Sequence, residues 1–178
     1  YPDHPESLYK AVEYVLNIGG KRIRPIFMLL SHQLFKRDIH KSLKSAIGIE
    51  IFHNFTLLHD DIMDKSFIRR GKKTVHEKWN NNTAILCGDM MCIQSYQLIS
   101  ESQSSTLKEV LDVFHKAAHR VCVGQQYDID FEDKKDVSIN DYLEMIDFDY
   151  CVWINSCHAM LKPETIDLAV LTLKKNNF

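Results

Sequence analysis

Glycine, proline and long apolar runs are all scarce in this sequence. Its 178 residues include six glycines and four prolines, and its apolar residues recur every three or four positions far more often than they alternate. That periodicity is typical of helices rather than strands, so an all-α fold is expected. The longest run of aliphatic and aromatic residues spans 26–30. A membrane span needs roughly 20 apolar residues, so no transmembrane segment is expected.

An excess of charge of one sign and a cysteine framework are also missing. Lysine and arginine total 22 against 24 aspartates and glutamates, a net charge of −2, so nothing indicates a nucleic-acid partner and any anion site must be local. The five cysteines are an odd number without a CxxC pair, which favours neither a zinc ribbon nor a disulfide framework. Reduced thiols predict a cytoplasmic location. The content of 45% hydrophobic residues is typical of a globular protein.

Apolar periodicity locates the expected helices. It predicts them over residues 8–16, 25–37, 43–63, 83–99, 106–131 and 139–146. Gly19-Gly20 would end the first helix, and Pro25 would lie in the first turn of the second. Ser42 and Ser138 are expected to cap the third and the last helix. Residues 65–82 are expected to form a long loop, because their periodicity is weak.

Carboxylates are concentrated at the end of the helix expected over residues 43–63. Asp60 and Asp64 would lie one turn apart on the same face, and Asp61 would be turned about 100° from Asp60. Oxygen ligands at this spacing suit Mg²⁺, which commonly bridges one or two carboxylates to substrate phosphates. A solvated acidic helix end is the alternative, although acids at a helix C-terminus oppose its dipole and so favour a functional reason.

Two basic clusters lie on either side of these acids in the sequence. Their members are Lys21, Arg22 and Arg24 in the first cluster, and Arg69, Arg70, Lys72 and Lys73 in the second. The first would lie at a helix N-terminus, where free N–H groups and the helix dipole already attract anions. Guanidinium groups in the second suit bidentate phosphate binding. Carboxylates that bind Mg²⁺, with a basic cluster on either side, are what two diphosphate esters need in order to bind side by side. The alternative for the second cluster is a solvated basic loop.

Five segments together resemble the trans-isoprenyl diphosphate synthases, the polyprenyl synthetase family. The resemblance lies in their residues, their order and their approximate spacing, and it covers most of residues 19–146. The segments are residues 19–25 (GGKRIRP), 53–64 (HNFTLLHDDIMD), 69–76 (RRGKKTVH), 84–89 (AILCGD) and 124–128 (GQQYD).

The resemblance implies a fold, an activity and an assembly. The fold would be the isoprenoid synthase fold, a helical bundle around a central active-site cavity. Residues 1–178 would form a single such domain that lacks part of the family's C-terminal half. The activity would join isopentenyl diphosphate to an allylic diphosphate with Mg²⁺, giving a short trans-prenyl diphosphate, farnesyl or geranylgeranyl diphosphate. Members of the family usually pair as homodimers, so a homodimer is expected.

The resemblance also implies a role for each matching residue. The diphosphate of isopentenyl diphosphate would be bound by Lys21, Arg24, His53 and Arg70. Arg69 would contact the allylic diphosphate, and Gln125 and Asp128 would line the allylic end of the site. Asp60 and Asp64 would bind Mg²⁺, with Asp61 as a ligand or as support for the ligands. The residues expected to act in catalysis are Lys21, Asp60, Asp61, Asp64 and Arg69.

The implied chemistry depends on charge. Breaking the allylic C–O bond leaves diphosphate and a carbocation, so Mg²⁺, lysine and arginine lower the barrier by neutralising the leaving group. A dry, helix-lined cavity would protect the cation from water and position the alkene.

Product length is expected to depend on residues one turn before the acids. Phe55 and Thr56 precede Asp60 by five and four residues, which places Phe55 roughly 7.5 Å along the helix from the metal site. An aromatic ring there resembles short-chain members of the family and could floor the cavity. The alternative is that Phe55 is a core residue.

Two other functions compete with a synthase. The family's second aspartate-rich motif has no counterpart in the sequence, so a non-catalytic subunit that binds prenyl diphosphates or regulates a synthase stays open. The intact acidic and basic motifs favour the enzyme, because a purely structural subunit needs none of them. A terpene cyclase would share the metal-triggered ionisation, but it has no need of a second diphosphate site at Lys21, Arg24 and His53.

Overall fold

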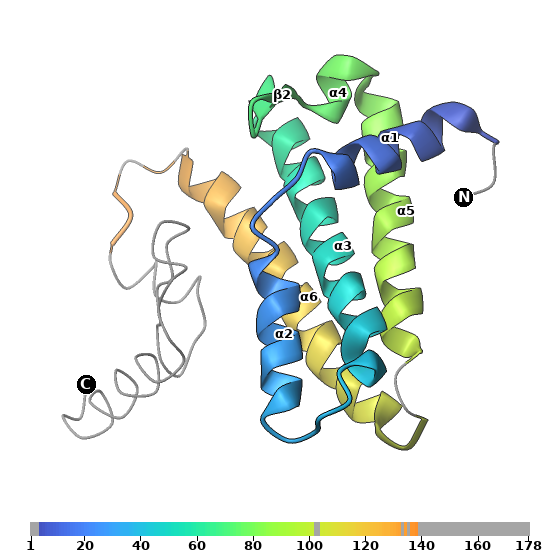
Figure 1. The fold of residues 1–178 in the computed structure, drawn as a ribbon. Coiled ribbons are helices and arrows are strands. Elements are labelled where there is room, and N and C mark those ends of the chain that lie inside the picture. The colour runs from blue at the N-terminus through green and yellow to red at the C-terminus, as the bar shows by residue number, and fades with distance from the viewer. Residues whose placement is uncertain (1–3, 102–103, 133, 135, 139–178) are drawn as a thin grey trace. The chain divides into compact units, whose positions relative to one another are not determined.

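The computed structural model describes residues 4–101, 104–132, 134 and 136–138. The chain divides into two compact units, residues 1–112 and 113–178. Figure 1 shows the order of the elements along the chain. They are α1 (Glu6–Asn17), α2 (Ile23–Gln33), α3 (His40–Met63), β1 (Ile68–Arg69), β2 (Lys72–Lys73), α4 (Val75–Lys78), α5 (Asn81–Ser100), the 3₁₀ helix η1 (Ser104–Thr106) and α6 (Leu107–Glu132).

The first unit is built around two long antiparallel neighbours, α3 and α5. They lie side by side, α1 crosses both of them, and α2 packs along α3 (Figure 1). Glycine allows the close approach of α3 and α5. A Cβ on Gly48 would lie 2.9 Å from Ile99 Cγ1 and 3.0 Å from the carbonyl oxygen of Ser95, and one on Gly88 would clash with the ring of His59.

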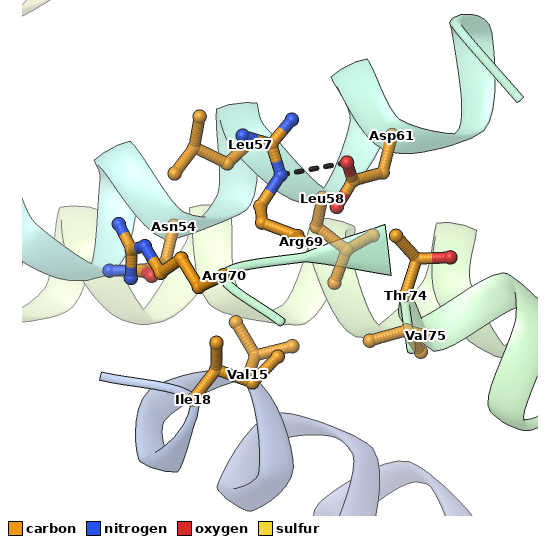
Figure 2. A pocket seen from close by; sticks show the side chains of 10 residues that line it. All are labelled: Val15, Ile18, Asn54, Leu57, Leu58, Asp61, Arg69, Arg70, Thr74 and Val75. Atoms are coloured by element: carbon orange, nitrogen blue, oxygen red, sulfur yellow. Dashed lines mark hydrogen bonds and ion pairs between the residues drawn. The ribbon is translucent and has the colours of Figure 1, made fainter. Parts of the chain in front are cut away.

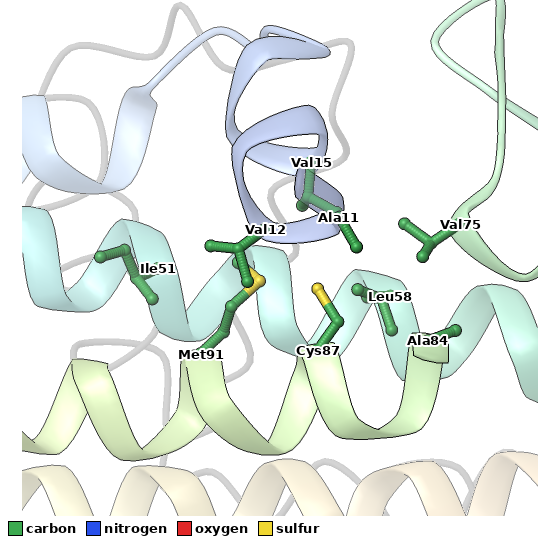
Figure 3. Close-up of a cluster of buried hydrophobic side chains, with 9 residues drawn as sticks. All are labelled: Ala11, Val12, Val15, Ile51, Leu58, Val75, Ala84, Cys87 and Met91. Carbon is green, nitrogen blue, oxygen red and sulfur yellow. The ribbon is translucent and has the colours of Figure 1, made fainter. Parts of the chain in front are cut away.

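The core of this unit lies where α1 meets α3 and α5, as Figure 3 shows. It is formed by Ala11, Val12, Val15, Ile51, Leu58, Val75, Ala84, Cys87 and Met91. Burial raises the pKa of the Cys87 thiol to about 12, so this cysteine is a core side chain rather than a reactive one. The second unit contains α6 from residue 113 onward. Among the described residues, no helix combines the length and hydropathy that a membrane span needs.

The all-α prediction is confirmed, and two local predictions are wrong. α3 begins at His40, so Ser42 lies inside its first turn, where its hydroxyl pairs with His32 Nδ1 at 2.6 Å instead of capping the helix. The segment 65–82 is not one loop, because it holds the β1–β2 hairpin and α4. The helix expected over residues 139–146, with its cap at Ser138, lies outside the described residues. The single-domain expectation stays a prediction.

The hairpin escaped sequence analysis because its strands are two residues long, too short to show a period. Ile68 pairs with Lys73 and Arg69 with Lys72. The two residues between the strands, Arg70 and Gly71, have φ values of 52° and 76°, the positive pair that a tight hairpin turn of this kind requires.

Candidate active site

The acidic end of α3 is followed at once by a turn that brings the hairpin back over it. Lys65 adopts a left-handed φ of 52°. The backbone N–H of Ser66 donates to the carbonyl oxygen of Asp61 at 2.9 Å, and that of Lys65 donates to Ile62 at 3.3 Å. These two bonds form a Schellman motif, which ends the helix and redirects the chain. As a result Arg69, on β1, returns to the carboxylates of α3.

Arg69 bridges two of the three aspartates. Its Nε donates to Asp61 Oδ1 at 2.7 Å and its Nη2 donates to Asp60 Oδ2 at 3.3 Å, and Figure 2 shows the first of these bonds. Asp61 is 5% exposed. Burial raises the pKa of Asp61, and the hydrogen bond and positive charge of Arg69 oppose that rise. Arg69 therefore supplies the counter-charge that a buried carboxylate requires.

The residues that would bind a metal are Asp60 and Asp64. Within the part of the chain that the structure describes, no three His, Cys, Asp or Glu side chains gather closely enough to hold a metal by themselves. Asp64 caps the end of α3 and is exposed, and the side chain of Asp60 is 29% exposed. Two carboxylates with room for waters and phosphate oxygens fit Mg²⁺, which rarely uses an all-protein cage. Asp61 is buried and bonded to Arg69, which favours a role in supporting the metal ligands over direct metal binding.

A basic cluster forms where the start of α2 meets the middle of α3. Arg24 Nη1 lies 3.0 Å from His53 Nε2, and because arginine can only donate, the histidine nitrogen accepts. Partial burial, followed by the positive charge of Arg24 and then by those of Arg70 and Arg69, lowers the pKa of His53 to about 4, although Glu50 opposes the shift. Burial also lowers the pKa of Arg24, again against the charge of Glu50. Crowded positive charge of this kind favours an anion.

Arg70 connects the hairpin to the loop before α2. Its Nη1 donates to the carbonyl oxygen of Gly19, and a Cβ on Gly20 would lie 2.7 Å from the same nitrogen. Glycine at position 20 therefore leaves room for the guanidinium. Lys21 follows on this loop and is exposed. The structure thus brings Arg24 into contact with His53 and Arg70 to the loop that precedes Lys21, and the binding roles of these four residues stay predictions.

Arg22, the remaining basic residue of the first cluster, is paired with a carboxylate and a backbone carbonyl. Arg22 Nη1 donates to Glu50 Oε1 at 2.7 Å and its Nη2 donates to the carbonyl oxygen of Leu16 at 2.8 Å. Sequence analysis missed Glu50. The available signal was a carboxylate in the middle of a largely apolar helix, because buried acids are rare without a partner.

The other predicted residues occupy less constrained places. Phe55 packs edge-on against His59, with ring centroids 4.8 Å apart, and against Phe52 at 5.4 Å. The Thr56 hydroxyl donates to the carbonyl oxygen of His53 at 2.8 Å, within the same helix. Gln125 and Asp128 are three residues apart on α6, in the second unit. The roles proposed for these four residues stay predictions.

A small pocket lies beneath the two arginines of the hairpin (Figure 2). Its volume is about 20 Å³, room for about one water molecule. It is lined by Val15, Ile18, Asn54, Leu57, Leu58, Asp61, Arg69, Arg70, Thr74 and Val75. This pocket is too small for a prenyl chain, so it is not the substrate cavity that the resemblance implies.

Comparison with known proteins identifies the family to which the chain belongs. Residues 5–158 match the model of the family described as polyprenyl synthetase. The chain is similar to a geranylgeranyl diphosphate synthase from Methanosarcina mazei, with 40% identity over 145 residues that cover 80% of this chain and 45% of the relative. It is also similar to a short chain isoprenyl diphosphate synthase from Methanocaldococcus jannaschii, with 40% identity over 82% of this chain and 45% of the relative.

Solved structures give the same result. The geranylgeranyl pyrophosphate synthetase from Geoglobus acetivorans superposes with a TM-score of 0.76 and 40% identity over 80% of this chain and 47% of the other. The chain spans just under half the length of the curated relatives named above.

Proposed function

The chain belongs to the polyprenyl synthetase family, and we propose that the complete protein is a trans-prenyltransferase. It would condense an allylic diphosphate with isopentenyl diphosphate to give a short-chain trans-prenyl diphosphate. The observation that carries the proposal is Arg69, which bridges Asp60 and Asp61 while the next residue, Arg70, reaches the Gly19-Gly20 loop. One hairpin thereby connects an acidic centre with a basic cluster, as a reaction between two diphosphates requires.

The isopentenyl diphosphate site in this proposal consists of Lys21, Arg24, His53 and Arg70. The contact between Arg24 and His53 and the effect of Arg70 on the pKa of His53 support a common site. A bound diphosphate would relieve the mutual repulsion of these cations, because its charge is opposite to theirs. The site would hold the alkene in place for attack on the allylic carbon.

The allylic diphosphate site consists of Asp60, Asp64 and Arg69, with Asp61 in support. When bound between Asp60 and Asp64, Mg²⁺ would supply positive charge to the diphosphate that leaves the allylic carbon. Arg69 would add a guanidinium to the same leaving group. The role of Gln125 and Asp128 in binding the allylic substrate rests on the resemblance of their motif alone. The departing diphosphate would accept the proton that the new prenyl chain loses.

The proposed product is farnesyl or geranylgeranyl diphosphate. The relatives named above carry the names geranylgeranyl and short chain isoprenyl diphosphate synthase. The bulky ring of Phe55, five residues before Asp60, supports a cavity floor that stops the product at a short length. We further propose a homodimer in the cytoplasm. Exposed apolar side chains on α5, namely Ile85, Leu86 and Ile93, support a surface for a second copy.

The test is a product assay with the complete protein. Isopentenyl diphosphate would be incubated with dimethylallyl, geranyl or farnesyl diphosphate, with and without Mg²⁺, and the products identified by mass. The proposal predicts Mg²⁺-dependent prenyl diphosphates that end at one length, and no turnover by Asp60→Ala. Binding of both diphosphates without turnover would contradict it and would favour a non-catalytic subunit that binds prenyl diphosphates.

A further inference from the structure

We propose that Arg22 and Glu50 are positioning residues, which hold segment 19–24, the loop before α2 and the first turn of that helix, in the shape that binds isopentenyl diphosphate and do not bind the substrate themselves. The inference rests on the proposed function, because it concerns the same site. It gives Arg22 a role different from that of the neighbouring cations, Lys21 and Arg24.

The side chain of Arg22 points to α3 and α1 and forms hydrogen bonds with both helices. Its guanidinium donates to Glu50 Oε1 on α3 at 2.7 Å and to the carbonyl oxygen of Leu16, in the last turn of α1, at 2.8 Å. Glu50 is 8% exposed. Arg22 therefore ties the loop to two helices, and its charge is already matched by a buried carboxylate.

A second buried side chain fixes the position of Glu50. Asn54 Nδ2 lies 3.2 Å from Glu50 Oε1 and donates to the carbonyl oxygen of Glu50 at 2.7 Å. Asn54 is 2% exposed. The carboxylate thus receives hydrogen bonds from two residues, so it has little freedom to turn toward the basic cluster.

The backbone of the loop needs such a tie. Gly19, Gly20 and Arg22 have φ values of 96°, 156° and 53°. The left-handed region is unfavourable for a residue with a Cβ such as Arg22, and it persists where the surroundings impose it. The two hydrogen bonds of its side chain are that constraint. Releasing them would allow the segment to relax, and Lys21 and Arg24 lie one residue before and two residues after Arg22.

The pair also lies next to the binding residues on α3. Glu50 precedes His53 by three residues, so both lie on the same side of the helix. The carboxylate of Glu50 affects the pKa values of both His53 and Arg24. A loop anchored at Glu50 is therefore anchored beside His53, which contacts Arg24.

The experiment compares four variants of the complete protein, namely three single variants and the double variant that combines Arg22→Asn with Glu50→Gln. Arg22→Asn removes both tethers but tolerates the left-handed backbone. Glu50→Gln keeps the shape and a hydrogen-bond acceptor. Met91→Ala is the control, because Met91 belongs to the core of the same unit but makes none of the hydrogen bonds that hold Arg22 and Glu50. Steady-state kinetics would be measured for each diphosphate, with thermal unfolding and calorimetric binding of isopentenyl diphosphate.

We expect Arg22→Asn to raise the KM for isopentenyl diphosphate about tenfold or more, since small misplacements of binding groups are costly. The KM for the allylic diphosphate should stay within about twofold. Glu50→Gln should lie between the wild type and Arg22→Asn, and the double variant should resemble Arg22→Asn alone because both changes break one pair.

Three outcomes would overturn the inference. They are an unchanged KM in Arg22→Asn, an equal rise for both substrates, and a rise in Met91→Ala that matches its loss of stability. If Arg22→Asn fails to fold, Glu50→Gln decides by the same criteria. A wild-type protein that does not bind isopentenyl diphosphate would overturn the proposed function and this inference together, whereas binding that is equal in wild type and variants would overturn only the inference.

Discussion

At the scale of single residues, the charged side chains of the site already form hydrogen bonds with one another. Asp61 and Arg69 form a pair that is mostly shielded from water, with side chains 8% and 27% exposed. Arg24 donates to His53. Buried charge is expensive unless it is paired and hydrogen-bonded, so the energetic cost of gathering these groups depends on each of these contacts. Single substitutions should therefore separate stability from binding.

The aspartates offer a direct comparison of two identical substitutions. Asp61→Asn removes the buried charge that Arg69 faces, and hydrogen bonds to charged groups contribute about 1.5–3 kcal/mol. We expect a loss of that order in the free energy of unfolding, measured by urea denaturation. Asp64→Asn, three residues later and exposed, should cost less than about 0.5 kcal/mol while lowering Mg²⁺-dependent activity. Equal losses of stability in both variants would contradict the account.

The lowered pKa of His53 predicts that the stability of the folded protein depends on pH. Its pKa falls from 6.5 in the unfolded chain to about 4 in the folded protein, so the unfolded state binds more protons between these values. Stability should rise with pH across this window, be complete above pH 6.5 and be lost as the pH falls toward 4. His53→Gln should flatten the profile of denaturation midpoints. His40→Gln, at an exposed histidine, is the control, and a flattening there of the same size would contradict the assignment.

Phe55 gives a prediction about product length. If its ring floors the cavity, Phe55→Ala should lengthen the product by at least one five-carbon unit, as measured by mass. Thr56→Ala should change it less, because the Thr56 hydroxyl is bonded within its own helix. A product of unchanged length would leave Phe55 as a core residue alone.

At the scale of elements, the site depends on how the hairpin and segment 19–24 are held in place. Tyr14 on α1 donates from its hydroxyl to the carbonyl oxygen of Lys73 on β2 at 2.7 Å, and the Lys78 ammonium lies 3.7 Å from the centre of the Tyr14 ring. The Thr74 hydroxyl donates to the carbonyl oxygen of Ser66 at 2.7 Å. These contacts hold the hairpin so that Arg69 faces the carboxylates of α3 and Arg70 faces the carbonyl oxygen of Gly19.

The contact between α3 and α5 predicts different effects for two glycine substitutions. Gly48→Ala would push a Cβ against the backbone carbonyl of Ser95, which cannot rotate away, so overpacking should cost about 1–3 kcal/mol of stability. Gly88→Ala would meet the His59 ring instead. That ring can move, but His59 immediately precedes Asp60 in the chain. Gly88→Ala should therefore lower the thermal unfolding temperature less than Gly48→Ala does, and lower turnover more. Thermal unfolding and turnover would be compared, and the reverse ranking would contradict the packing argument.

Elements with a strong period could be predicted from the sequence, and single contacts could not. The span of α3 was predicted to within a few residues because its apolar side chains repeat over six turns. The cap at Ser42 failed because a tertiary partner, His32, takes its hydroxyl. The basic residues at 21, 22 and 24 look equivalent in the sequence, yet Arg22 turns to Glu50. That choice depends on the fold, which no local pattern encodes.

At the scale of the whole molecule, the match to the polyprenyl synthetase family runs over residues 5–158. Most of the predicted binding residues lie in the first unit, whereas Gln125 and Asp128 lie in the second. The central claim is that one hairpin serves two diphosphates. A cyclase would use one diphosphate substrate, and a binding subunit would release none.

The release of inorganic diphosphate tests this claim most directly. It would be measured for the complete protein with an allylic diphosphate, with and without isopentenyl diphosphate and Mg²⁺, alongside the amount of prenyl product. We predict one diphosphate released for each new carbon–carbon bond, and release only when both substrates and Mg²⁺ are present. Release without isopentenyl diphosphate, or no release with all components, would contradict the account.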